Sequence, residues 1–437
     1  RSMVYRPIYE DTSDIEQEAV LNDVSNDKET WRKTNPEIIS KPVDTVRKEK
    51  RHISGAKQTT SELPDTVMAM ALKKAMEGDE REDFDFLLEE KIEIEPTAYS
   101  DPFLRTLYLL EQGAVLRKED ERFVITKEDR VIKEIPLIKV DQILIFGNIQ
   151  ITTQAMKFCL EEDVPIILLS SSGKYFGTVE SFKSVTITLH KKQFERVDDR
   201  EFALDIGRNI VRAKINNSKV LIQRYARKRK NLNIESEIHA INLLIDRLPS
   251  VSKHEELMGV EGAASSRYFS VLRALIGEEW GFTKRQKNPP PDPVNSLLSY
   301  GYTLLFYNIY AMIRMHGLHP YAGFLHSIRD GHPALVSDMI EEFRAPIVDA
   351  VVLNLITRRS LKKEDFIIPE DERSLCLLKD TTRKIFIKAF EGKMNSSIAH
   401  EATGYQVDYR RCIDLQVQAL RKVINGNLSE YKPMMIK

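Results

Sequence analysis

Four side chains in three separate segments of the 437-residue chain could hold one divalent metal ion. They are Glu261, His326, Asp338 and Glu341. One imidazole with carboxylate oxygens suits Mg²⁺ or Mn²⁺, whereas a structural zinc site more often recruits cysteine. If the three segments converge, the chemistry they support is the cutting or joining of a phosphodiester.

Each candidate also has an ordinary structural interpretation. Glu261 could be an exposed carboxylate in the first turn of a helix, where the helix dipole favours it. His326 could be a core or helix-end histidine, the more common state of a single histidine. Asp338 and Glu341, three residues apart on one helix face, could form a surface ion-pair ladder with Arg344. Their apolar neighbours favour a buried helix instead, and therefore a metal.

The charge distribution points to a polyanion as partner. The net charge of the whole chain is −1, but residues 1–100 carry 23 acidic and 15 basic side chains, so the remainder is basic. An acidic front joined to a basic body is typical of chains whose body binds nucleic acid. A basic cluster at 224–230, a basic segment in the proline-rich loop 281–293 and a tyrosine of the helix that follows are the candidate DNA contacts. These residues are Arg224, Arg227, Lys228, Arg229, Lys284, Arg285 and Tyr300.

Several other chemistries are excluded by missing motifs. The sequence holds no nucleotide-binding glycine loop, no nucleophile elbow, no His-Glu-x-x-His and no polymerase Tyr-x-Asp-Asp. Its three cysteines, Cys159, Cys376 and Cys412, are far apart, which fits a reducing cytoplasm and no disulfide framework. No stretch approaches the about 18 to 20 apolar residues of a membrane span, so no membrane association is expected.

The periodicity predicts an α+β fold in which a small β-rich domain precedes a larger all-α domain. We expect an acidic, partly helical extension over 1–100, a β-rich domain over 101–192 with one crossover helix at 151–161, and an α-helical catalytic domain over 193–437. Apolar residues at helical spacing predict the long helices of the last domain. Their expected ranges are 203–225, 234–247, 263–276, 294–316, 334–356, 381–390 and 407–424.

The order and spacing of several motifs resemble one family, the CRISPR-associated spacer integrase and endonuclease (Cas-one). The similarity covers about residues 102–437. It rests on Val140-Asp141-Gln142-Ile143-Leu144-Ile145-Phe146-Gly147-Asn148 in the β-rich part, and on Glu261-Gly262-Ala263-Ala264, Gly317-Leu318-His319-Pro320, Gly323-Phe324-Leu325-His326 and the segment 338–344 in the helical part.

The resemblance implies a function and partners. Glu261, His326 and Glu341 would bind Mg²⁺ or Mn²⁺, with Asp338 beside them as an auxiliary acid. The site would join the 3′-hydroxyl of a spacer DNA fragment to a CRISPR repeat by transesterification. Alternatively, His326 contacts the leaving oxygen or the DNA. Family members act as homodimers, built largely through the β-rich domain and bridged by a dimer of Cas-two.

Residues 1–100 depart from the plain family pattern. Some relatives carry a fused reverse transcriptase or an iron–sulfur nuclease ahead of this module. No cysteine precedes Cys159, which disfavours the nuclease, so the front is expected to be a linker or the end of a larger fusion. Two other functions stay open: a transposase-like integrase on the same fold, and a catalytically inactive DNA-binding scaffold. The absence of an added DNA-binding domain before Lys437 disfavours the first, and the presence of the three metal-binding candidates disfavours the second.

Overall fold

The computed structural model describes residues 105–181, 186–229, 232–287, 289–369 and 375–437. They all belong to one compact unit, Ile94–Lys437. The extension expected over 1–100, with its helices, lies outside the described residues. No described helix is both long enough and apolar enough to cross a bilayer.

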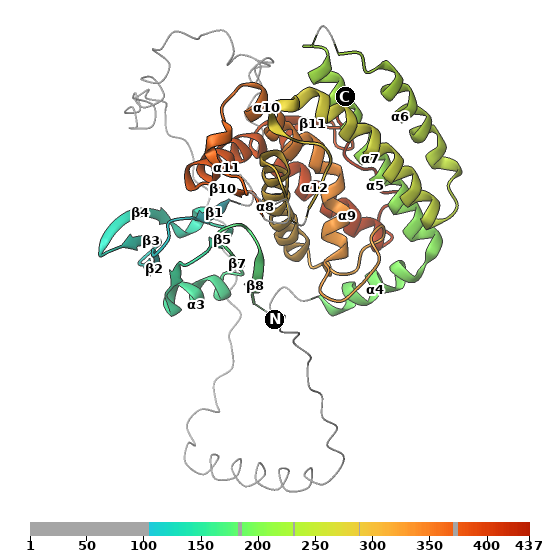
Figure 1. Ribbon diagram of the computed structural model, residues 1–437. Coiled ribbons are helices and arrows are strands. Elements are labelled where there is room, and N and C mark those ends of the chain that lie inside the picture. The colour runs from blue at the N-terminus through green and yellow to red at the C-terminus, as the bar shows by residue number, and fades with distance from the viewer. Residues whose placement is uncertain (1–104, 182–185, 230–231, 288, 370–374) are drawn as a thin grey trace, which may run out of the picture. The chain divides into compact units, whose positions relative to one another are not determined.

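The first part of the described chain is β-rich, as expected, and contains two four-stranded sheets (Figure 1). In the first sheet three strands run parallel and the last is antiparallel; its strands in order are β1 (Thr106–Leu109), β5 (Gln142–Phe146), β7 (Ile166–Leu169) and β8 (Tyr175–Val179). The second sheet has the order β4 (Arg130–Pro136), β3 (Arg122–Lys127), β2 (Val115–Glu119) and β6 (Gln150–Ile151). The predicted crossover helix is α3 (Thr153–Glu161).

The two faces of the first sheet are buried in different cores. Ile143 and Ile145 pack with the second sheet and α3, whereas Leu144 and Phe146 join the core of the helical part. Because successive side chains of β5 enter two different cores, both faces of this strand are buried. Its sequence is therefore a continuous apolar run, which predicts a buried strand. Strands β4, β6 and β8 were not predicted. β4 has a largely exposed burial pattern and lies at the edge of its sheet, so it lacks the apolar alternation that marks a strand.

The second part is helical, and its first helix begins before the expected boundary at residue 193. Its helices are α4 (Ile187–Asp198), α5 (Arg200–Ala226), α6 (Glu235–Arg247), α7 (His254–Ile276), α8 (Pro293–Met315), α9 (Ala334–Phe343), α10 (Ala350–Thr357), α11 (Asp380–Met394) and α12 (Tyr409–Ile424). Two short hairpins accompany them: β9 (Phe366–Ile367) with β10 (Leu377–Leu378), and β11 (Ser397–His400) with β12 (Tyr405–Asp408).

Helix α7 starts nine residues before the expected position, at His254 instead of Ala263. Gly259 and Gly262 lower the helix propensity of this stretch, and this hid it in the sequence. Tertiary packing offsets their cost, because Leu257, Val260 and Ala264 are all buried. Glu261 therefore lies inside the helix, and its interpretation as an exposed first-turn residue is wrong.

The expected single helix over 334–356 is interrupted by a π-helical turn, Arg344–Asp349, between α9 and α10. Pro346 lies in this turn; a proline has no N–H and its ring clashes with the carbonyl four residues earlier, so a wider turn accommodates it. In a π-helix, hydrogen bonds join residues five apart, which brings Arg344 and Asp349 to nearly the same side. Such turns occur frequently at functional sites.

Residues near the C-terminal end hold α9 in place through hydrogen bonds to Glu342. The backbone N–H of Met434 donates to Glu342 Oε2 at 2.8 Å, and the Tyr431 hydroxyl donates to Glu342 Oε1. Gln416 of α12 donates to Oε2 at 3.0 Å, and the Asn217 side chain of α5 bridges the carbonyls of Glu342 and Met434. The side chain of Glu342 is completely buried, so the position of α9 is fixed on its inner face.

Glu342 gives stability a predictable pH dependence. Burial raises its pKa from 4.5 to about 7, against the opposing effect of its hydrogen bonds from Tyr431, Met434 and Gln416. Between pH 4.5 and 7 the folded state therefore binds more protons than the unfolded state, so this contribution to stability is lost as the pH rises through that window. Its size is on the order of 3 kcal/mol.

We expect Glu342→Gln, which mimics the protonated acid, to remove this dependence. As the pH rises from 5 to 8, the wild type should lose unfolding free energy relative to the variant. Urea unfolding at several pH values measures it. A difference that stays constant over this range would contradict the assignment.

Candidate active site

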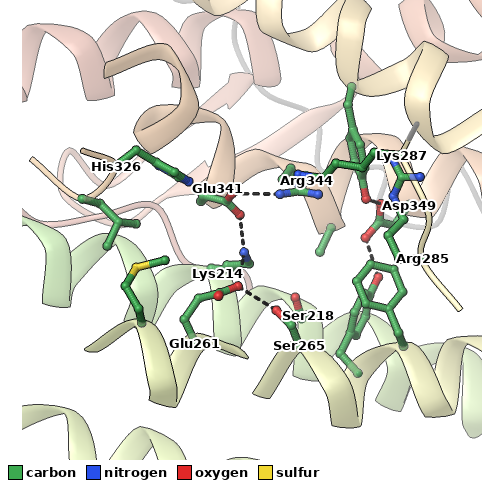
Figure 2. Close-up of a pocket in the computed structure, with 16 residues that line it drawn as sticks. Lys214, Ser218, Glu261, Ser265, Arg285, Lys287, His326, Glu341, Arg344 and Asp349 are labelled. Carbon is green, nitrogen blue, oxygen red and sulfur yellow. Dashed lines mark hydrogen bonds and ion pairs between the residues drawn. The ribbon is translucent and has the colours of Figure 1, made fainter. Parts of the chain in front are cut away.

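Three elements bring the predicted metal ligands together in one pocket of about 230 Å³ (Figure 2). Glu261 comes from α7, Glu341 from α9, and His326 from the loop between α8 and α9. The convergence expected from the sequence is therefore present in the structure. The surface ion-pair ladder is wrong as an interpretation, because Asp338 and Glu341 are 0% and 4% exposed.

A lysine from α5 lies between the two glutamates. Lys214 Nζ is 2.5 Å from Glu261 Oε1 and 2.7 Å from Glu341 Oε2. The two carboxylates thus share a single small cation, although they are far apart in the sequence. Ser265, one turn after Glu261, donates a hydrogen bond of 2.8 Å to the same Glu261 oxygen.

His326 is oriented by Asp338. Its Nδ1 lies 2.8 Å from Asp338 Oδ1, which leaves Nε2 as the ring nitrogen available to a ligand in the pocket. The same carboxylate accepts hydrogen bonds from the backbone N–H groups of Phe324 at 2.5 Å, Leu325 at 3.0 Å and His326 at 2.8 Å. Both Asp338 oxygens are engaged by this loop. These contacts favour a role for Asp338 in positioning His326 over the predicted role of an auxiliary acid beside the metal.

A glycine makes this arrangement possible. A Cβ at Gly323 would lie 2.7 Å from Asp338 Oδ2 and 2.7 Å from the carbonyl carbon of Ala334, closer than real Cβ atoms come. We expect Gly323→Ala to force the loop away from α9, lowering both the melting temperature and the activity. Gly392→Ala is a matched control, because its Cβ meets open space within α11. Equal melting temperatures for the two variants would contradict this packing.

The electrostatics keep Glu341 ionised. Burial raises its pKa, but the charges of Arg344 and Lys214 outweigh burial and lower the pKa to about 2. Arg344 Nη1 donates to Glu341 Oε1 at 2.8 Å. Oε2 is buried, and its nearest partner is the Lys214 ammonium, 2.7 Å away. An ionised oxygen with unused acceptor capacity is suited to a metal.

The donor set thus fits a hard divalent cation such as Mg²⁺ or Mn²⁺: two carboxylates and one imidazole nitrogen. The atoms are not at coordinating distances as they stand. Within the described residues, no three His, Cys, Asp or Glu side chains form a group that could hold a metal directly. Between the glutamates, the position that a metal would take is filled by the Lys214 ammonium.

The floor of the pocket is a buried network built on the π-helical turn. Asp349 accepts hydrogen bonds of 2.5 Å from the hydroxyls of both Tyr268 and Tyr302. The Arg344 guanidinium lies 4.2 Å from the centre of the Tyr302 ring. Burial raises the pKa of Asp349, and the two tyrosine hydrogen bonds oppose that rise. This network holds Arg344 in place against Glu341.

The proline-rich loop supplies cations to the same side of the pocket as Asp349 (Figure 2). Asn295 of α8 holds this loop by accepting from Arg285 Nη1 at 2.9 Å and from the Gln286 N–H at 2.8 Å. Arg285 and Lys287 line the pocket as a result. Partial burial, followed by the charge of Arg344, lowers the pKa of Lys287, so these cations repel one another in the absence of an anion.

The other predicted DNA contacts lie elsewhere. The exposed residues Arg224, Arg227, Lys228, Arg229 and Lys284 are not among the described residues that line the pocket. Arg224 donates to the Lys437 carbonyl, and Arg229 donates to the Leu275 carbonyl at 3.1 Å. Their role on DNA stays a prediction. For Tyr300 the prediction is wrong: it is 3% exposed and packs between Phe146 and Phe386, where it joins the β-rich and helical parts.

Sequence reasoning missed two residues that line the pocket, Lys214 and Asp349. Lys214 did leave a signal, because it shares a helix face with the apolar and buried residues Ile210 and Val211. Charged residues on a buried helix face are rare without a partner. The partner itself could not be read from the sequence, because Glu261 lies 47 residues away.

Comparisons with known proteins match the chain to one family. The family model of the CRISPR associated protein Cas1 matches residues 107–392. A CRISPR-associated endonuclease Cas1 of Thermus thermophilus is 32% identical over 337 residues, covering 76% of this chain and 97% of the relative. A Cas4/Cas1 fusion of Geobacter sulfurreducens is 33% identical over 364 residues, covering 79% of this chain and 63% of the fusion.

Solved structures show the same fold. A Cas1 protein from Thermotoga maritima has a TM-score of 0.63 and 26% identity, covering 76% of this chain and all of that one. A casposase bound to its integration product shares the fold with a TM-score of 0.67 and 23% identity, covering 76% of this chain and 94% of that one. The resemblance seen in the sequence motifs is confirmed, and the chain belongs to the family of the CRISPR-associated protein Cas1.

Proposed function

We propose that the protein is a Mg²⁺- or Mn²⁺-dependent DNA endonuclease and integrase that inserts spacer DNA into a CRISPR array by transesterification. One observation carries the proposal: Glu261 and Glu341 share one small cation in a pocket that also contains His326. Relatives named CRISPR-associated endonucleases, about a third identical over nearly their whole length, support it.

In this proposal Glu261, Glu341 and His326 Nε2 would hold the metal, which stabilises negative charge on the phosphodiester when bound. Asp338 keeps Nε2 of His326 turned toward the pocket, and Arg344 keeps Glu341 ionised. Arg285 and Lys287 bind phosphate oxygens and hold the strand in line for attack.

The bond changes balance without an external energy source. The 3′-oxygen of the spacer fragment forms a new bond to phosphorus of the repeat strand. The P–O bond to the repeat's own 3′-oxygen breaks, and that oxygen gains the proton that the attacking hydroxyl lost. One phosphodiester is exchanged for another, which fits a pocket that offers charge stabilisation and positioning.

The proposed partners are a second copy of this chain and a Cas2 dimer (Cas-two) that bridges two such homodimers. Three apolar side chains on the β-rich part are at least half exposed: Val131 at 57%, Ile132 at 50% and Ile138 at 80%. Such exposed apolar side chains support a protein interface there. Size-exclusion chromatography coupled to light scattering tests the homodimer.

A strand-joining assay tests the proposed function. Labelled duplex fragments with free 3′-hydroxyls are incubated with a repeat-bearing plasmid, the protein and its Cas2 partner, in Mg²⁺, Mn²⁺ or EDTA. We expect label in the plasmid at the repeat boundary with either metal and none in EDTA. A transposase-like integrase would join without preference for the repeat. A scaffold would bind DNA and join nothing, which would overturn the proposal.

A further inference from the structure

Lys214 is enclosed by the groups it pairs with. Its side chain is 17% exposed, as is that of Glu261, and the side chain of Glu341 is 5% exposed. The lysine lies on α5, on the same helix face as buried Ile210 and Val211, and its side chain lines the pocket. Its ammonium therefore acts on these two carboxylates rather than on bulk solvent.

The ammonium and a divalent metal compete for the same oxygens. Nζ contacts Glu261 Oε1 and Glu341 Oε2 at 2.5 and 2.7 Å. A Mg²⁺ ion bound to these oxygens at about 2.1 Å would lie almost on top of the nitrogen. The charges also oppose joint occupancy. The pocket is lined by four cationic side chains (Lys214, Arg285, Lys287 and Arg344) and three carboxyl groups (Glu261, Glu341 and Asp349), so a divalent ion would add to an excess of positive charge in a half-buried site.

Of the two cations, Lys214 is the one that can move. Arg344 is held by Glu341 on one side and by the Tyr302 ring on the other, above the Asp349 network. A lysine ammonium stands on a flexible four-carbon stem and has no fixed fork geometry. Ser218, one turn further along α5, lines the same pocket and offers a polar surface to a displaced ammonium.

We propose that Lys214 is a displaceable counter-cation: it holds Glu261 and Glu341 together before metal loading and must leave their oxygens when a divalent metal enters. This inference rests on the proposed function, because it takes the two glutamates as the metal ligands. Lys214 then sets the metal affinity of the site by competition. It also prevents the repulsion that two neighbouring carboxylates would otherwise exert on α7 and α9.

The test compares the full-length protein with Lys214→Met, which keeps the length of the stem and removes the charge. Lys219→Met on the same helix is the matched control, since Lys219 donates to Asn242 at 3.1 Å and does not line the pocket. Mn²⁺ binding is measured by titration with electron paramagnetic resonance, and the melting temperature is measured with EDTA and with Mn²⁺. Neither measurement depends on catalysis.

We expect Lys214→Met to bind Mn²⁺ at least about tenfold more tightly than wild type, to melt at a lower temperature in EDTA, and to regain that loss in Mn²⁺. The control should match wild type. If Lys214→Met fails to fold, adding Glu261→Gln removes the repulsion and should restore folding in EDTA. Failure of that double variant to fold would contradict the role of Lys214 as counter-cation.

The outcomes separate this inference from the proposed function. If wild type binds Mn²⁺ and Lys214→Met binds it no more tightly, the role of Lys214 as a counter-cation is contradicted, whereas the proposed metal site is not. If Glu261→Gln binds Mn²⁺ as well as wild type does, the metal site itself is overturned, and the inference falls with it.

Discussion

Glu261→Gln is expected to reduce metal-dependent strand joining on the order of a thousandfold, while DNA binding stays within a factor of about two. The loss corresponds to about 4 kcal/mol of charge stabilisation that the metal would supply. His326→Ala, which removes the Nε2 ligand, should behave in the same way. DNA binding persists because the exposed basic residues and the cations of the pocket are unchanged.

The matched control is Glu255→Gln, an exposed glutamate in the first turn of the same helix α7. Joining is followed by gel electrophoresis of labelled fragments, and DNA binding by fluorescence anisotropy in EDTA. Unchanged joining in either Glu261→Gln or His326→Ala would refute the assigned site. Equal loss of DNA binding and joining would instead point to a role in binding alone.

Asp338→Asn is expected to weaken metal binding and joining about 10- to 100-fold, the usual cost of losing a partner that orients a metal ligand. An asparagine offers one acceptor oxygen and turns an NH₂ group toward backbone donors. It cannot satisfy the N–H groups of Phe324, Leu325 and His326 together with the His326 ring. The histidine then loses both its orientation and its tautomer.

A role in positioning is separable from a purely structural one. Raised Mn²⁺ concentrations should recover a large part of the activity of Asp338→Asn, because the ligands remain and only their arrangement is weakened. The same Mn²⁺ concentrations should not restore the activity of Glu261→Gln. Asp330→Asn, in the exposed part of the same loop, is the control. Asp338→Asn with wild-type metal affinity would contradict the positioning role.

Much of the site could be predicted because its parts lie in short motifs whose local order carries information. Glu261 beside small residues, His326 after an apolar pair, and Glu341 on an apolar helix were recognised one by one. The long helices and buried strands were recognised for the same reason, since their periodicity is local. The start of α7 was missed where glycines mask a stretch that tertiary packing makes helical.

What the sequence did not reveal depends on contacts between remote residues. Lys214 becomes part of the site only because α5 packs beside α7 and α9. Tyr300 is one of four tyrosines on one long helical stretch, where core packing is usual and a DNA contact was the alternative that we predicted. It packs on Phe146, a residue of the β-rich part. Asp338 and Glu341 look alike in the sequence, and only the loop that donates to Asp338 separates their roles.

Crystals soaked in Mn²⁺ and measured at its absorption edge test the central claim most directly. We expect an anomalous peak at about 2.0 to 2.3 Å from oxygens of Glu261 and Glu341 and from Nε2 of His326, with the Lys214 ammonium moved away from those oxygens. A peak elsewhere, with Lys214 still between the two glutamates at saturating Mn²⁺, would contradict it.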